Sequence, residues 1–119
     1  LPEIAGKAAL ENTFFSSLYS PDDTSDLNKE FVAEYKKAYN TNPDVFAALA
    51  YDSALLVAKA IEDAGSADPA KIAEAMAKIK GFKGVSGEVT FNEQHNPIKS
   101  AVIIEHKDGK QTFKTKVNP

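Results

Sequence analysis

The chain has 119 residues, enough for one domain with its own core, and its 43% hydrophobic and 26% charged residues are ordinary globular values. The net charge is −3 and all 14 basic residues are lysines, so the arginine fork that suits phosphate and guanine is absent and no nucleic-acid partner is expected. The lack of cysteine excludes disulfides, thiolate chemistry and cysteine-based zinc sites.

The first part of the chain contains a predicted strand, a turn and an amphipathic helix. β-Branched and aromatic side chains predict a strand around Thr13–Ser17, and Ser20-Pro21-Asp22-Asp23 predicts a turn. Thr24 or Ser25 can cap the helix that we expect over residues 25–39. The apolar face of this helix repeats every fourth residue, at Leu27, Phe31, Tyr35 and Tyr39.

The most apolar stretch predicts a central helix over residues 43–64. Asn42 can cap it, Pro43 suits its first position, and Gly65 can end it in a left-handed conformation. Between Val45 and Ala58 the only polar side chains are Tyr51, Asp52 and Ser53.

A helix with apolar residues on nearly every face is normally buried on nearly every face. We therefore expect a sheet on one side of the central helix and other helices on the other, with Leu55, Leu56 and Ile61 in the core. Several charged residues, among them Asp52 and Lys59, argue against a membrane span.

The last third of the chain predicts one more helix followed by strands. Asp68-Pro69 marks the start of a helix over about residues 69–79. Strands are expected at Val89–Phe91 and Ala101–Glu105, and Asp108-Gly109 predicts a tight turn into a return strand, Gln111–Lys116. The fold class is α/β, with about three helices on a small sheet and a C-terminal hairpin.

The sequence offers little support for catalysis. His95 and His106 have no carboxylate at ligand spacing, so we interpret both as ordinary surface histidines. Gly81, Gly84 and Gly87 precede a predicted strand and not a helix, so they do not form a phosphate-binding loop. We expect no enzyme activity, no cofactor and no metal.

Three residues of the central helix are candidate binding residues. Asp52 is a charge in an apolar helix, so it either pairs with a lysine or a backbone amide, or faces a cleft and holds a polar group of a ligand. Phe46 and Tyr51 are either core aromatics or the walls of an apolar pocket.

The order of several segments resembles the late part of periplasmic leucine/isoleucine/valine-binding proteins, which have a type I solute-binding fold. The similar segments run from Phe31 to Asp44, Ala47 to Ala54, Ala64 to Ile72, Phe82 to Phe91 and through Asp108-Gly109-Lys110. They cover nearly all 119 residues in order.

This resemblance implies a two-lobed receptor of which the chain is a C-terminal fragment. The chain would cross between lobes near Ser20-Pro21 and near Asn96–Lys99. Residues 22–96 would then belong to one lobe, and residues 1–21 and 97–119 would supply strands to the other. Phe46 matches an aromatic residue that lines the pocket for the solute side chain, whereas Tyr51-Asp52 matches a common variant without an assigned contact.

The function implied is the substrate-binding component of an ABC-type branched-chain amino acid importer, which binds a solute by lobe closure. Its partners would be an amino acid and an ABC permease, and its place would be extracellular or periplasmic, with a lipoprotein anchor in the full-length protein. The alternative is a ligand-sensing domain of a receptor or regulator with the same fold. Because a fragment leaves apolar surface uncovered, we also expect the fragment to form a homo-oligomer.

Overall fold

The computed structural model describes residues 2–119 and contains, over that range, five helices and two three-stranded antiparallel sheets. The elements are α1 (Pro2–Ala5), α2 (Lys7–Leu10), β1 (Phe14–Ser17), α3 (Asp26–Tyr39), α4 (Val45–Ala64), α5 (Pro69–Ala77), β2 (Phe82–Gly84), β3 (Gly87–Phe91), β4 (Pro97–Lys99), β5 (Ala101–Lys107) and β6 (Lys110–Val117). The predicted α/β class is confirmed.

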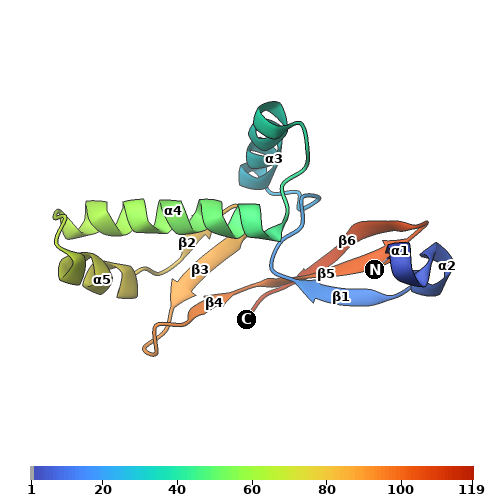
Figure 1. Ribbon diagram of the computed structural model, residues 1–119. Coiled ribbons are helices and arrows are strands. Elements are labelled where there is room, and N and C mark those ends of the chain that lie inside the picture. The colour runs from blue at the N-terminus through green and yellow to red at the C-terminus, as the bar shows by residue number, and fades with distance from the viewer. Residues whose placement is uncertain (1) are drawn as a thin grey trace.

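The elements form two halves that meet where the chain crosses between them (Figure 1). The hairpin half contains α1, α2 and the sheet in the order β1-β5-β6; the helical half contains α3, α4, α5 and the sheet in the order β2-β3-β4. The radius of gyration is 16.8 Å, against about 13.5 Å for a compact domain of this length. The chain is therefore elongated.

The chain passes between the halves at two places. The first lies between β1 and α3, near the predicted turn at Ser20-Pro21. The second lies at Ser100, because β4 still pairs with β3 whereas β5 pairs with β1 and β6. Ser100 immediately follows the interval Asn96–Lys99.

Local signals set the ends of the helices. Asp68 caps α5 by accepting hydrogen bonds from the Ala70 and Lys71 amides, with Pro69 in the first position as predicted. The predicted cap of α4 at Asn42 is wrong: Asp44 caps the helix by accepting from the Ala47 amide at 2.8 Å. Both residue types can cap, and the helix begins two residues later because Asp44 has the extended backbone of a cap.

The hairpin of β5 and β6 turns at Asp108-Gly109, as predicted. Both residues have positive φ, 51° and 70°, which a two-residue turn of this kind requires. The sequence did not predict the short elements α1, α2, β2 and β4, each of only three or four residues.

Only one face of α4 is buried in this chain, so the expectation that it is covered on nearly every side is wrong. The buried positions recur every fourth residue, at Ala48, Asp52, Leu56 and Ala60. This face packs against α5 and the β2-β3 hairpin, where Leu56 and Ala60 join Ile79 and Val89 in a cluster. Leu55 and Ile61, predicted to lie in the core, are 40% and 43% exposed because they point away from these elements.

Candidate functional site

The first three turns of α4 carry all three candidate binding residues, and the structure places each in a different environment. Phe46 lies in the first turn and is 77% exposed. Tyr51 is 45% exposed, and its ring lies 4.8 Å from that of Phe31 in α3. Asp52 is 3% exposed and lies on the buried face of the helix. The three side chains do not converge on one point of this chain.

Asp52 binds the turn between β2 and β3. One carboxylate oxygen accepts a hydrogen bond from the Val85 amide at 2.7 Å, and the other accepts from the Ser86 amide at 2.9 Å and from the Ser86 hydroxyl. Lys99 in turn donates to the Ser86 hydroxyl oxygen at 2.6 Å. Of the two readings of Asp52 from the sequence, this geometry matches the one in which it accepts backbone amides.

Gly84 explains why the turn can approach Asp52 so closely. A Cβ atom at this position would lie 2.5 Å from the Asp52 carboxylate, closer than real side chains come. Position 84 therefore requires glycine because there is no room for a side chain. An unusual backbone angle is not the reason, since the φ of Gly84 is not positive.

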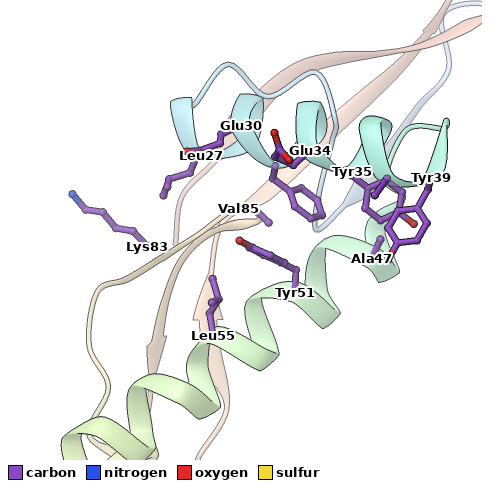
Figure 2. A pocket seen from close by; sticks show the side chains of 12 residues that line it. Leu27, Glu30, Glu34, Tyr35, Tyr39, Ala47, Tyr51, Leu55, Lys83 and Val85 are labelled. Carbon is purple, nitrogen blue, oxygen red and sulfur yellow. The ribbon is translucent and has the colours of Figure 1, made fainter.

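A groove of about 760 Å³ runs between α3 and α4, and Tyr51 lies in it (Figure 2). Phe31, Tyr35 and Tyr39 of α3 supply most of its aromatic lining, and Glu30, Glu34 and Lys83 supply charge. The apolar residue at every fourth position of α3 predicted an apolar face on this helix. The structure shows that this face lines the groove. In this chain Tyr39 is mostly exposed, because nothing in residues 2–119 covers the end of the groove.

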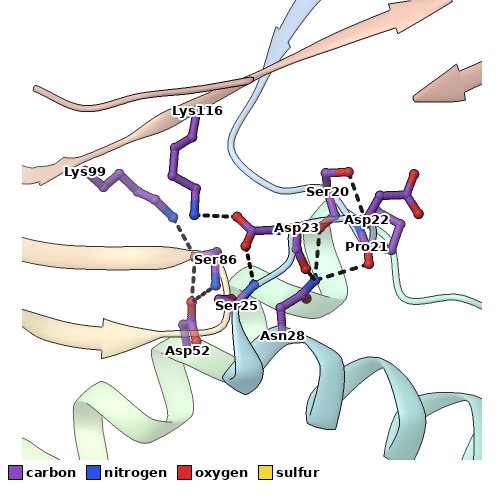
Figure 3. A network of polar contacts seen from close by, with 10 residues as sticks. All are labelled: Ser20, Pro21, Asp22, Asp23, Ser25, Asn28, Asp52, Ser86, Lys99 and Lys116. Carbon is purple, nitrogen blue, oxygen red and sulfur yellow. Dashed lines mark hydrogen bonds and ion pairs between the residues drawn. The ribbon is translucent and has the colours of Figure 1, made fainter. Parts of the chain in front are cut away.

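A second group of polar residues lies at the crossing between the halves (Figure 3). Asp23 forms an ion pair with Lys116 of β6 and accepts a hydrogen bond from the Ser25 amide at 2.9 Å. Burial alone would raise the pKa of Asp23, but the hydrogen bonds from Lys116 and Ser25 outweigh burial and hold this pKa below its usual value. Burial also lowers the pKa of Lys99, which lies near Lys116.

Asn28 and Tyr19 complete this buried region. The Asn28 side-chain amide donates to the carbonyls of Ser20, Pro21 and Asp23 at 3.3, 3.1 and 2.8 Å. Within the described residues, the Asn28 side-chain oxygen and the Tyr19 hydroxyl are buried without a hydrogen-bond partner. Burial, with the nearby acids Asp23, Asp22 and Asp52, raises the pKa of Tyr19 well above its usual value. No sequence pattern indicates this cluster beyond the turn at Ser20-Pro21.

Residues 2–119 show neither a metal-binding cluster nor a membrane-spanning helix. No group of three or more His, Asp or Glu side chains in residues 2–119 is placed to hold a metal ion. In the same range, none of the helices combines the length and the hydrophobicity that a membrane crossing requires.

Comparison with known proteins gives consistent matches. Residues 2–111 match the family model described as periplasmic binding protein. A leucine-, isoleucine-, valine-, threonine- and alanine-binding protein of Pseudomonas aeruginosa is 36% identical over 89 residues, which are 71% of this chain and 23% of that protein.

Solved structures match over almost the whole chain. A leucine-binding protein of Thermotoga maritima is 38% identical with a TM-score of 0.84, and the match covers 99% of this chain and 35% of that one. A branched-chain amino acid transporter substrate-binding protein of Streptococcus pneumoniae, solved with isoleucine, is 35% identical with a TM-score of 0.83 and covers 99% and 34%. The chain thus spans about a third or less of the length of the proteins it matches.

Proposed function

Because this chain belongs to the periplasmic binding protein family, we propose that it forms the C-terminal part of the substrate-binding component of an ABC-type amino acid importer. The observation that carries the proposal is the match of 99% of this chain to a leucine-binding protein and to a branched-chain amino acid transporter substrate-binding protein solved with isoleucine, at TM-scores of 0.84 and 0.83. A solute with an apolar side chain, such as leucine, isoleucine or valine, is the expected cargo.

The proposed mechanism is reversible binding between two lobes, without chemistry and without a cofactor. The helical half would belong to one lobe and the hairpin half would supply strands to the other. The pairing of β4 with β3 favours a second boundary at Ser100 over one at Asn96. Closure of the lobes around two or three such crossings would bury the solute.

Phe46 is the residue of this chain that we assign to the solute. It lies at the start of α4, the end of the helix nearest the crossing (Figure 1), and its ring is free of the groove between α3 and α4. An exposed aromatic ring there can contact the side chain of an amino acid. Asp52 already accepts hydrogen bonds on both oxygens, so we assign it to holding the β2-β3 turn, and Tyr51 to the groove.

The test is calorimetric titration of leucine, isoleucine and valine into the complete protein that the gene encodes. We expect binding of at least one of them. Phe46→Ala should weaken it by about 1–3 kcal/mol, the scale of a lost apolar contact. Tyr39→Ala, which removes a 67% exposed aromatic ring from the groove at the C-terminal end of α3, serves as the control and should leave affinity unchanged. Absence of binding would refute the function; unchanged affinity in Phe46→Ala would refute only the site.

The proposal also covers the cellular location of the protein and its partner in transport. An importer's binding component works outside the cytoplasmic membrane with an ABC permease, so we propose an extracellular or periplasmic protein with a secretory or lipoprotein signal. The complete reading frame tests this directly. A permease-binding assay with the complete protein tests the partner.

We also propose that this chain on its own self-associates through the open face of α4. Its exposed apolar residues include Val57 and Ile61, and contiguous surface of this kind commonly marks an interface. The outer edges of β1 and β6 add free strand edges. Sedimentation equilibrium at micromolar concentration tests the proposal, and a monomer would refute it.

A further inference from the structure

The two halves are joined by few interactions besides the chain itself. The pairs of elements with the most extensive backbone contact lie within one half or the other, among them β5 with β6 and α4 with α5. Two crossing segments alone would act as a loose hinge. What sets the angle between the halves must therefore lie among the side chains at the crossing.

Asp23 belongs mechanically to the helical half. The Asn28 side-chain amide, on the first turn of α3, binds three carbonyls of the segment 20–23, and the Asp23 carboxylate accepts the amide of Ser25 just before α3. Asn28 is completely buried. These bonds fasten the first crossing segment to α3, so Asp23 moves with that helix.

Lys116 belongs to the other half. It lies in β6, opposite Val102 of β5, and so moves with the β1-β5-β6 sheet. Its ammonium group meets the Asp23 carboxylate at the crossing (Figure 3), where the Asp23 side chain is 10% exposed and that of Lys116 is 30% exposed. The other nearby ammonium, that of Lys99, is bound to the Ser86 hydroxyl and leaves Lys116 as the partner of Asp23.

We propose that the Asp23–Lys116 ion pair is an orientation lock, which holds the β1-β5-β6 sheet at one angle to α3 and α4. A pair shielded from solvent is screened less than an exposed one, and breaking this pair leaves the buried Asp23 carboxylate without its partner. The lowered pKa of Asp23 agrees with a carboxylate stabilised in its charged form. The lock concerns the angle that this chain adopts without solute, so its test does not depend on whether the protein transports one.

The chain offers a matched control. Lys114 lies two residues before Lys116 on the same strand and pairs with Glu105 of β5 at 3.0 Å. That pair lies inside the hairpin half and spans no crossing. Removal of either lysine's charge is therefore the same chemical change with a different expected effect on the angle between the halves.

The experiment measures the distance between the halves by pulsed electron resonance. The chain has no cysteine, so Ala73→Cys on α5 and Lys110→Cys on β6, both at exposed positions, give a single pair of spin labels. Labelled chain is diluted with unlabelled chain to remove distances between copies. The parent and Lys114→Met should give one narrow distribution, and Lys116→Met a distribution at least twice as wide.

Two further variants, Asp23→Asn and Lys116→Arg, test the ion pair by removing the other charge and by restoring the cation. Asp23→Asn keeps an acceptor for the Ser25 amide but removes the charge, and it should widen the distribution as Lys116→Met does. Lys116→Arg restores a cation and should restore the narrow distribution. A parent distribution that is already wide, or Lys116→Met and Asp23→Asn distributions as narrow as the parent's, would overturn the proposal.

Discussion

The two faces of α4 are alike in composition and opposite in environment. The face that contains Ala48, Leu56 and Ala60 packs on α5 and the β2-β3 hairpin, whereas the face that contains Val57 and Ile61 is open. A cluster of apolar residues indicates that a surface is buried in the native protein. It does not indicate that the residues that bury this surface lie in the same stretch of chain. Here the chain spans about a third of the length of its solved relatives, in which further chain is available to cover the second face.

The largest effect is expected from Asp52, the one charge on the buried face. Asp52→Ala leaves the buried Val85 and Ser86 amides without an acceptor, and removes a negative charge that favours the charged form of Lys99. We expect a loss of about 3–5 kcal/mol in the free energy of unfolding, the range for breaking a buried charged network. Urea unfolding followed by circular dichroism measures it.

Asp63→Ala is the control for this substitution. Asp63 is also on α4, but its ion pair with Lys59 is exposed on the surface. Exposed pairs of this kind contribute little, so its loss should cost less than about 0.5 kcal/mol. If Asp52→Ala cost no more than Asp63→Ala, the β2-β3 turn would not depend on the carboxylate.

The difference between the faces predicts unequal effects of two adjacent leucines. Leu56 is 9% exposed in the cluster with Ile79 and Val89, and Leu55 is 40% exposed on the wall of the groove. Leu56→Ala should cost about 2–4 kcal/mol, because it removes buried contacts and leaves a cavity. Leu55→Ala should cost less than about 1 kcal/mol. Equal losses would mean that the groove is filled in solution.

Sequence reasoning succeeded where the signals are local. Proline next to an N-cap, a left-handed glycine and Asp-Gly at a hairpin each act through neighbouring residues, so the three long helices and the hairpin were predictable. The start of α4 was misplaced by two residues because Asn42 and Asp44 can both cap. The covering of α4 was mispredicted because the composition of a helix does not say which of its faces other residues cover.

The site was less predictable because the groups that bind its side chains are distant in the sequence and of types that occur throughout the chain. Asp52 was recognised as a charge that needs a partner, but the partners are backbone amides more than 30 residues away, and every residue except proline has such an amide. Gly84 was visible in the sequence, but only the structure shows that a Cβ there would meet Asp52. The pairing of Asp23 with Lys116 has no local pattern at all.

The raised pKa of Tyr19 predicts that the parent chain and Tyr19→Phe differ in the pH dependence of their stability at alkaline pH. It packs with Phe31, Ala48 and Val85 on the buried face of α4, and its pKa is raised in the folded chain. The stability that comes from this shift is fully present below the ordinary tyrosine pKa of about 10 and is lost as pH rises through the folded pKa. Tyr19→Phe should therefore lose less stability than the parent between pH 9 and 11 (roughly the titration range of tyrosine).

At neutral pH, Tyr19→Phe should change the free energy of unfolding by no more than about 1 kcal/mol. The hydroxyl has no hydrogen-bond partner among the described residues, so its removal leaves no donor or acceptor behind. Urea midpoints of both proteins at each pH provide the comparison, in which the other titrating groups cancel. A parallel decline in both proteins would remove Tyr19 as the cause.

The smallest effect on stability is expected from a substitution on the open face of α4. The same substitution tests whether a second copy of the chain covers that face. Ile61 is 43% exposed, opposite the buried stripe, so Ile61→Gln should change the unfolding free energy of the monomer by less than about 0.5 kcal/mol. If two copies associate through this face, the same substitution should shift sedimentation toward the monomer and should lower stability only at concentrations where the dimer forms. A loss above about 2 kcal/mol that does not depend on concentration would mean that the open face is buried within one copy, and that the two faces of α4 do not differ as described.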